Sequence, residues 1–171
     1  MMNILSVSKL LHYKLILAIL IGIGFAATAV PAYAHFIYED GFTYASDFDC
    51  AANRAEISHG SGGGYSRSDI AAWVIGGDEP CRDHFIRPAG YLRAASDLDK
   101  WSGSSWQPCV VSNWTYSTKS AHTLQVATDY GSNPPCGSGI YRTYGDGQFL
   151  NGTWKGGGLS SGGTGHTLPP P

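Results

Sequence analysis

Apolar and polar residues alternate most clearly between His122 and Tyr130. Leu124 and Val126 occupy even positions of this segment, and the polar Gln125 occupies an odd one. A period of two residues is the repeat of a β-strand that buries one of its faces. The pattern therefore predicts a half-buried strand.

Turn-forming residues separate further extended segments after Gly90. Ser102–Ser105 lies between Tyr91–Trp101 and Trp106–Tyr116, which is typical of a hairpin. Asp-Gly and Asn-Gly pairs, the strongest signals for short hairpin turns, separate the last extended segments. These segments and turns are Ile140–Tyr144, Asp146-Gly147, Gln148–Leu150, Asn151-Gly152 and Thr153-Trp154. An antiparallel meander is expected over residues 91–155.

One segment of the first half carries the signals of a short helix. Ser66 or Ser68 is suited to cap its amino end, and Asp69 would complement the helix dipole there. The apolar run Ile70–Ile75 then ends at Gly76-Gly77, a typical helix stop. We predict a helix of about two to three turns over this run.

Together these elements predict a mainly β to α+β fold. We expect a small antiparallel sandwich or open barrel of about five to seven strands with one short helix. A single domain over residues 35–171 is predicted to follow a signal peptide at 1–34. Its parts are a helix-bearing, glycine-rich part (35–90), an antiparallel part (91–155) and a glycine- and proline-rich tail (156–171) whose end is expected to be mobile. Most of the core area is assigned to four tryptophans: Trp101, Trp106, Trp114 and Trp154.

The first 34 of the 171 residues have the three parts of an export signal. Lys9 and Lys14 give a positive start, Leu15–Val30 is apolar, and Pro31–Ala34 places small residues at a cleavage position. An apolar run of 16 residues, interrupted by glycines, is too short to span a bilayer. We therefore expect a secreted chain that begins at His35 and has no membrane anchor.

The chain after residue 34 is rich in glycine and aromatic residues and poor in charge. It holds 21 of the 23 glycines and 18 of the 21 aromatic residues, and charged residues make up 14% of the sequence. Its nine Lys and Arg face 13 Asp and Glu. Because binding of phosphate needs clustered basic groups, this balance disfavours nucleic acids and anionic membrane surfaces as partners.

Four cysteines, Cys50, Cys81, Cys109 and Cys136, lie in the predicted mature chain. An even number of cysteines in an exported chain indicates disulfides. Zinc sites use close pairs such as Cys-x-x-Cys, and the spacings of 31, 28 and 27 residues provide none. Of the three possible connectivities we favour Cys50 with Cys81 and Cys109 with Cys136, because sequential pairing holds each half locally.

The histidine at the predicted mature terminus is a candidate metal ligand. The free amine and a ring nitrogen of His35 could hold one copper ion together with a second histidine. The segment Ala34-His35-Phe36 resembles the start of mature lytic polysaccharide monooxygenases, which implies a copper monooxygenase. The possible partners are His59, His84, His122 and His166. Cleavage after Ala32 instead would abolish the site.

Paired carboxylates offer a hydrolytic alternative. Glycoside hydrolysis needs two carboxyl groups about 5 to 9.5 Å apart. Asp47 with Asp49 and Asp97 with Asp99 stand at alternate positions, so each pair shares one face if its segment is a strand. Solvated surface carboxylates are the simpler interpretation, and the dense calcium-loop pattern is missing.

The glycine-rich segment His59–Gly64 loosely resembles the oxyanion loop of lipases and esterases. Those hydrolases also need a Gly-x-Ser-x-Gly nucleophile elbow, and Gly64–Ser68 lacks the second glycine. We interpret the segment as a flexible turn.

Aromatic side chains give the broadest functional option, because sugars bind on exposed Trp and Tyr faces. Single exposed aromatic residues are common, so only a coplanar row would indicate such a site. The candidates are Trp101, Trp106, Trp114, Tyr116, Tyr141, Tyr144 and Trp154. They fill the core, or one or two of them remain outside as a binding platform.

Five short motifs are distributed over the predicted mature chain. They are Ser58-His59-Gly60, Gly64-Tyr65-Ser66, Arg87–Arg93, Pro135–Gly139 and Asn151–Trp154. Together they resemble a family of small secreted bacterial proteins with a signal peptide and four cysteines. The resemblance covers nearly the whole mature chain and implies export and a shared disulfide framework. It assigns no activity and no functional residue.

These observations favour a secreted, two-disulfide, non-enzymatic module without a cofactor. Such a module would bind a glycan or another protein at the cell envelope or in the medium. One alternative is a small secreted enzyme, which would be a carboxylate-based glycan hydrolase or the copper monooxygenase. Another is a bacteriocin-like or inhibitory protein, although the acidic charge disfavours attack on anionic membranes.

Overall fold

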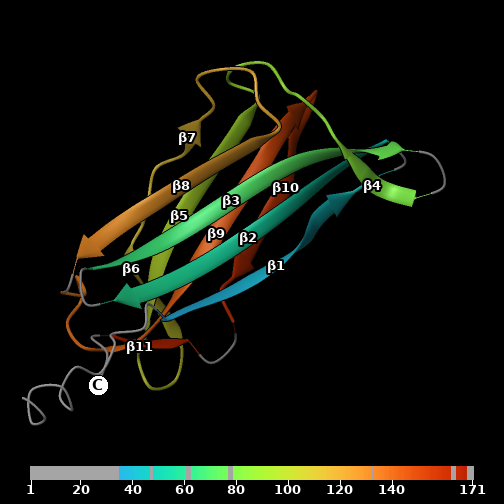
Figure 1. Cartoon of the computed structure of the whole chain (residues 1–171). Helices are drawn as coiled ribbons and strands as arrows, with labels where there is room; N and C mark the ends of the chain where they lie inside the picture. The colour runs from blue at the N-terminus through green and yellow to red at the C-terminus, as the bar shows by residue number, and fades with distance from the viewer. Residues whose placement is uncertain are drawn as a thin grey trace, which may run out of the picture. The chain divides into compact units, whose positions relative to one another are not determined.

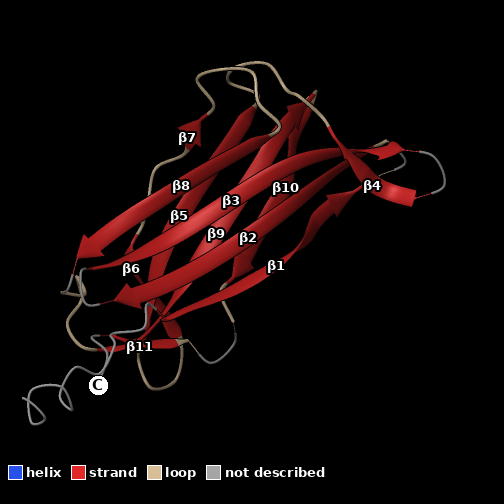
Figure 2. Ribbon diagram, viewed as in Figure 1, coloured by secondary structure: helices blue, strands red, loops and turns tan. Residues whose placement is uncertain are grey.

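A computed structural model describes residues 35–46, 48–60, 63–76, 79–131, 133–162 and 165–168. The predicted signal peptide (1–34) lies outside these residues. The described chain is all-β, with 11 strands in two antiparallel sheets (Figures 1 and 2). Among the described residues there is no helix, and so none with the length and hydrophobicity that crossing a membrane requires.

The first sheet contains five strands and the second contains six. The first comprises β1 (His35–Ala45), β2 (Asp49–Gly60), β3 (Gly63–Gly76), β4 (Glu79–His84) and β8 (Thr123–Gly131). The second comprises β5 (Leu92–Trp101), β6 (Trp106–Val110), β7 (Thr115–Tyr116), β9 (Gly139–Asn151), β10 (Thr153–Ser160) and β11 (His166–Leu168). A sandwich is thus confirmed, with more strands than expected.

In the first sheet the order is β1-β2-β3, and β8 and β4 share the free edge of β3. In the second sheet the order is β10-β9-β5. There β11 extends the β10 side of β9, and β6 and β7 line the far edge of β5. β2 and β3 pack against β9, and β8 packs against β5 (Figure 1).

The predicted helix over Ile70–Ile75 is wrong, because this segment lies within β3. β3 is hydrogen-bonded to β2 on one side and to β8 and β4 on the other. Its even-numbered residues Ser66, Ser68 and Ile70 are buried between the sheets, while the odd-numbered ones are half-buried on the outer face. Strand partners on both edges override the local helix signals.

Two predicted turns are confirmed and a third is not. Ser102–Ser105 joins β5 to β6, and Asn151-Gly152 joins β9 to β10, with Gly152 in the left-handed region (φ 68°). Asp146-Gly147 instead lies in the middle of β9. The boundary of the predicted tail is also wrong, since β10 continues to residue 160 and β11 follows at 166–168. Residues 169–171 lie outside the described chain.

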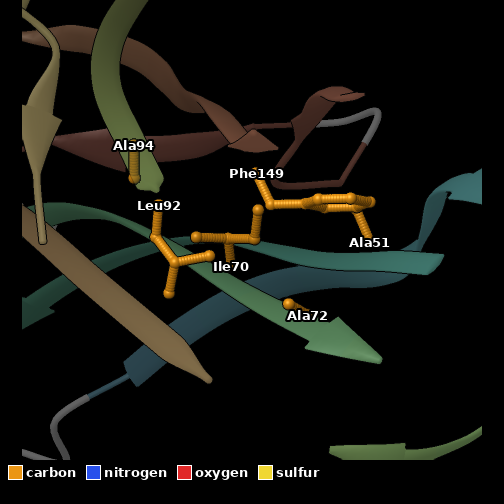
Figure 3. Close-up of a cluster of buried hydrophobic side chains, with 6 residues drawn as sticks. All are labelled: Ala51, Ile70, Ala72, Leu92, Ala94 and Phe149. Carbon is orange, nitrogen blue, oxygen red and sulfur yellow. The ribbon is translucent and has the colours of Figure 1, made fainter. Parts of the chain in front are cut away.

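The core consists of aliphatic residues and two large aromatic ones. Its two clusters are Ala51, Ile70, Ala72, Leu92, Ala94 and Phe149 (Figure 3), and Ile57, Leu98, Tyr141 and Leu168. The tryptophan core is wrong, because none of the four tryptophans is buried. A Cβ on Gly147 would lie 2.7 Å from the Cβ of Ile70, and one on Gly145 would lie 2.8 Å from Ser68 Oγ. The sheets therefore approach too closely there for an indole ring.

Buried polar groups join the two sheets as well. The hydroxyl of Thr143 lies 2.7 Å from the carbonyl oxygen of Glu56 and 2.9 Å from Ser66 Oγ, and Ser66 Oγ lies 2.9 Å from Ser96 Oγ. Asn53 donates to the carbonyl oxygen of Gly147 (3.0 Å). These bonds satisfy the hydroxyl groups and the amide nitrogen of Asn53, which would otherwise destabilise the interior.

Both predicted disulfides, Cys50–Cys81 and Cys109–Cys136, are present, and no cysteine is free. The first links β2 to β4, the short strand at the edge of β3. The second links β6 to the segment that precedes β9.

Candidate binding groove

The outer face of the first sheet presents its side chains in rows across β1, β2, β3 and β8. Strand register places Asp40, Arg54, Asp69 and Gln125 in one row, and Phe42, Ala52, Ala71 and Thr123 in the next. The first row is charged and polar. The second has only methyl groups on its two central strands, so the backbone there is left uncovered.

A groove of about 510 Å³ opens over these two rows. That volume is within the range of small-ligand sites. Its lining residues are Asp40, Gly41, Phe42, Ala52, Asn53, Arg54, Asp69, Ile70, Ala71, Thr123, Leu124 and Gln125. The groove thus has an apolar floor at Ala52 and Ala71, with Phe42 at one end of that row and the charged row alongside.

Exposed aromatic side chains continue from the groove along β1. Phe36, Tyr38 and Phe42 are 52%, 46% and 57% exposed, and they occupy alternate positions on the outer face. The rings of Phe36 and Tyr38 are stacked, with centroids 5.9 Å apart and planes 28° from parallel. We call these three residues the β1 aromatic row.

The charged row is held by ion pairs. Nη2 of Arg54 lies 2.8 Å from Oδ2 of Asp40, and its guanidinium carbon lies 4.5 Å from the ring centroid of Tyr38. The hydrogen bond to Asp40 is the main reason why the pKa of Arg54 is raised, although burial opposes the rise. The guanidinium is therefore turned toward β1.

A second pair lies beside the groove on β2 and β3. Nη2 of Arg67 lies 2.7 Å from Oε2 of Glu56, and the hydroxyl of Tyr65 donates to Oε1 of the same carboxylate. With its amide oxygen facing the guanidinium, Gln125 accepts from Nε and Nη1 of Arg67 (3.1 Å each). Every nitrogen of Arg67 is thus engaged.

Asp69 is the least compensated carboxylate of the groove. Its Oδ2 lies 3.4 Å from Nη2 of Arg67, and its Oδ1 is buried without a hydrogen-bond partner among the residues that the structure describes. Burial raises the pKa of this carboxyl; the charge of Glu56 raises it further, whereas Arg67 and Arg54 lower it.

Each described carboxylate of the predicted pairs is engaged by a neighbouring group. Asp49 lies 2.7 Å from Nη2 of Arg87, Asp97 accepts from the backbone N–H of Ser112 (2.8 Å), and Asp99 lies 3.0 Å from Nε of Arg142. Asp47 lies outside the described residues. The three described carboxylates therefore support neighbouring segments, and none of them lines the groove.

The candidate copper ligands are brought together only in part. His35 faces His59 in the register of β1 and β2, but their side chains lie outside the described part of the structure. His84 and His122 are neighbours elsewhere, with ring centroids 4.4 Å apart, and His166 lies in β11. Among the described residues no three His, Cys, Asp or Glu side chains cluster as metal ligands. The glycine-rich segment at 59–64 forms the β2–β3 connection, of which residues 61–62 lie outside the described chain.

The predicted aromatic platform is replaced by stacks on the second sheet. The guanidinium of Arg93 lies between the rings of Trp114 and Trp154, 4.2 and 4.1 Å from their centroids. Trp101 and Trp106 pack at 60°, with Arg142 over Trp106. Ring contacts thus go to the protein's own arginines, and these tilted rings form no flat row. Of the remaining candidates, Tyr141 is in the core, and Tyr116 and Tyr144 are exposed.

The sequence interpretation missed the β1 aromatic row because it examined only aromatic residues after position 100. The signal was available as the alternation Phe36-x-Tyr38-x-Asp40-x-Phe42. Asp69 was also misplaced, since it was assigned to a helix terminus.

Comparison with protein-family models, with curated proteins and with solved structures found no match to this chain.

Proposed function

We propose that this protein is an extracellular, non-enzymatic glycan-binding module. The observation that carries the proposal is the groove on the outer face of the first sheet, continued by the β1 aromatic row. A pyranose ring has an apolar C–H face and a polar hydroxyl edge. The row offers rings for the first, and the Asp40, Arg54 and Asp69 side chains offer acceptors and donors for the second.

The dimensions favour an oligosaccharide over a single sugar. Phe36 and Phe42 are six residues apart on β1, which corresponds to about 20 Å at ~3.4 Å per residue. Ala52 and Ala71 leave room for a ring beside Phe42, and the stacked Phe36 and Tyr38 offer a second contact. A chain of several sugar units would thus contact both ends.

An extracellular location is part of the proposal. Two disulfides are typical of proteins that fold in oxidising compartments. The predicted export signal at 1–34 supplies the route.

The test is binding of the exported protein to immobilised peptidoglycan, chitin, cellulose and teichoic acid. We expect retention on at least one of them, and at least tenfold weaker binding for Tyr38→Ala and Phe42→Ala. Tyr116→Ala is the matched control, because Tyr116 is equally exposed (46%) but lies on the second sheet. No retention on any of the four polymers would refute the proposal, and equal losses for all three variants would refute the location of the site.

A second candidate function, the copper monooxygenase, is favoured by one observation. The register of β1 and β2 pairs the backbone of His35 with that of His59. If the signal is cleaved before His35, its amine and these two imidazoles would supply three nitrogen ligands. Intact-mass analysis of the exported protein tests the terminus, and Cu²⁺ titration followed by electron paramagnetic resonance tests the ligands. Any other terminus, or an unchanged spectrum for His59→Ala, would eliminate this candidate.

A further inference from the structure

The charges along the groove are unevenly balanced. Its lining includes two carboxylates, Asp40 and Asp69, and one cation, Arg54. Arg54 is bonded to Asp40 and turned over Tyr38. The negative charge that remains is therefore concentrated at Asp69.

The neighbouring cation, Arg67, compensates Asp69 only in part. Arg67 lies 2.7 Å from Glu56 and 3.4 Å from Asp69, so its shorter bond is to Glu56. Gln125 engages its two other nitrogens. Oδ1 of Asp69 is left buried without a donor within the described chain. The Asp69 side chain as a whole is 30% exposed, so a ligand in the groove can reach its carboxylate. A half-buried carboxylate in this state is stabilised most by a donor that also carries a positive charge.

The surroundings of Asp69 limit what that donor can be. The neighbouring row offers methyl groups at Ala52 and Ala71 and the exposed ring of Phe42, so the cation has to be carried on a frame with an apolar face. A negatively charged sugar such as a uronic acid would face two carboxylates, which disfavours it. We propose that the groove is specific for a glycan with free amino groups, and that Asp69 binds the ammonium of a hexosamine unit. This inference rests on the proposed glycan-binding function and adds the class of sugar.

Three tetrasaccharides with the same β-1,4 backbone test the inference. They are the tetramers of glucosamine, N-acetylglucosamine and glucose, which differ only at C2 as ammonium, acetamide and hydroxyl. Calorimetric titration of the exported protein at pH 6 should give about tenfold tighter binding of the glucosamine tetramer than of the glucose tetramer, the effect of one charge-assisted hydrogen bond. Added salt should reduce this preference.

Two variants separate a specific contact from general charge attraction. Asp69→Asn should abolish the preference for the glucosamine tetramer while binding of the glucose tetramer persists. Asp129→Asn removes the same charge from an exposed position of β8 on the same face, outside the groove lining, and should keep the preference. Circular dichroism would establish that both variants are folded.

Each alternative result has a defined meaning. Equal affinity for the three tetramers would refute the amino-sugar inference and leave glycan binding intact. No binding of any tetramer would also refute the inference, and the polymer panel would then decide whether the glycan proposal survives. Displacement of the glucosamine tetramer by trilysine at equal concentration would show that the groove recognises amines in general, which would refute the sugar class.

Discussion

Two half-buried carboxylates, one on the outer face of each sheet, have pKa values that burial raises and that nearby charges modify. Asp69 lies in the groove, and Asp146 lies on β9 of the second sheet. Each has an Oδ1 atom without a partner among the described residues. Burial is the main cause that raises the pKa of Asp146; Arg93 lowers it and Asp97 raises it. Asp69 has a proposed ligand, whereas Asp146 has none.

Replacing Asp146 with Asn should stabilise the protein at pH 7. A carboxyl whose pKa is raised in the folded state destabilises that state above the raised pKa, and the cost disappears below the ordinary value of about 3.9. We expect Asp146→Asn to raise the melting temperature by about 2 to 4 °C at pH 7. The difference from the wild type should shrink as the pH falls toward 3. Thermal unfolding followed by circular dichroism from pH 3 to 8 measures this, and a difference that grows on acidification would contradict it.

At the scale of elements, local patterns predicted strands where one face is buried and failed where tertiary pairing decides. Alternation between residues 122 and 130 was sufficient to predict β8. The turn signals at Ser102–Ser105 and Asn151-Gly152 were sufficient to predict two hairpins. The helix over Ile70–Ile75 failed because an apolar run is equally suited to a central strand. The pairing of both of its edges depends on residues far away in the sequence.

The groove was less predictable than the strands for a similar reason. Its rows combine one residue from each of four strands, so they exist only once the register is known. A shift of register between Phe42 and Tyr44 in β1 makes the groove still harder to predict from the sequence. It leaves Phe42 on the outer face, whereas Tyr44 packs on the core beside Phe149. Simple alternation places both rings on the same face.

Glycines of β9 set how closely the two sheets pack. A Cβ at position 147 would lie 2.7 Å from the Cβ of Ile70 and 2.8 Å from Oδ1 of Asn53. We expect Gly147→Ala to lower the free energy of unfolding by about 1 to 3 kcal/mol, the usual cost of overpacking. Gly157→Ala is the matched control, because Gly157 is the direct partner of Gly147 on β10 and its Cβ would meet only ordinary contacts at 3.8 Å. Urea unfolding of both variants measures the effect, and equal midpoints would contradict it.

At the scale of the whole molecule, two disulfides close separate loops. Cys50–Cys81 and Cys109–Cys136 span 31 and 27 residues and do not overlap along the chain. By the chain-entropy estimate each contributes about 3 to 4 kcal/mol. Because domains of this size are stable by only about 5 to 15 kcal/mol, the two together account for a large share.

Reduction of both disulfides should therefore leave the protein marginally folded or unfolded. We expect the urea midpoint to fall strongly in dithiothreitol at 25 °C, with four thiols titratable after denaturation. An unchanged midpoint in protein shown to have four free thiols would contradict this expectation. The double variants Cys50→Ser/Cys81→Ser and Cys109→Ser/Cys136→Ser would divide the loss between the two loops.

The floor of the groove lies on β2 and β3, and each of these strands is hydrogen-bonded along both of its edges. Such backbone is already ordered before a ligand arrives, so association costs little conformational entropy there. The same rigidity means that a ligand on this floor meets no hinged or loosely held segment of β2 or β3 that it could move. The protein would then attach to its ligand without a change of conformation. Any effect of binding would have to come from the location at which the ligand retains the protein.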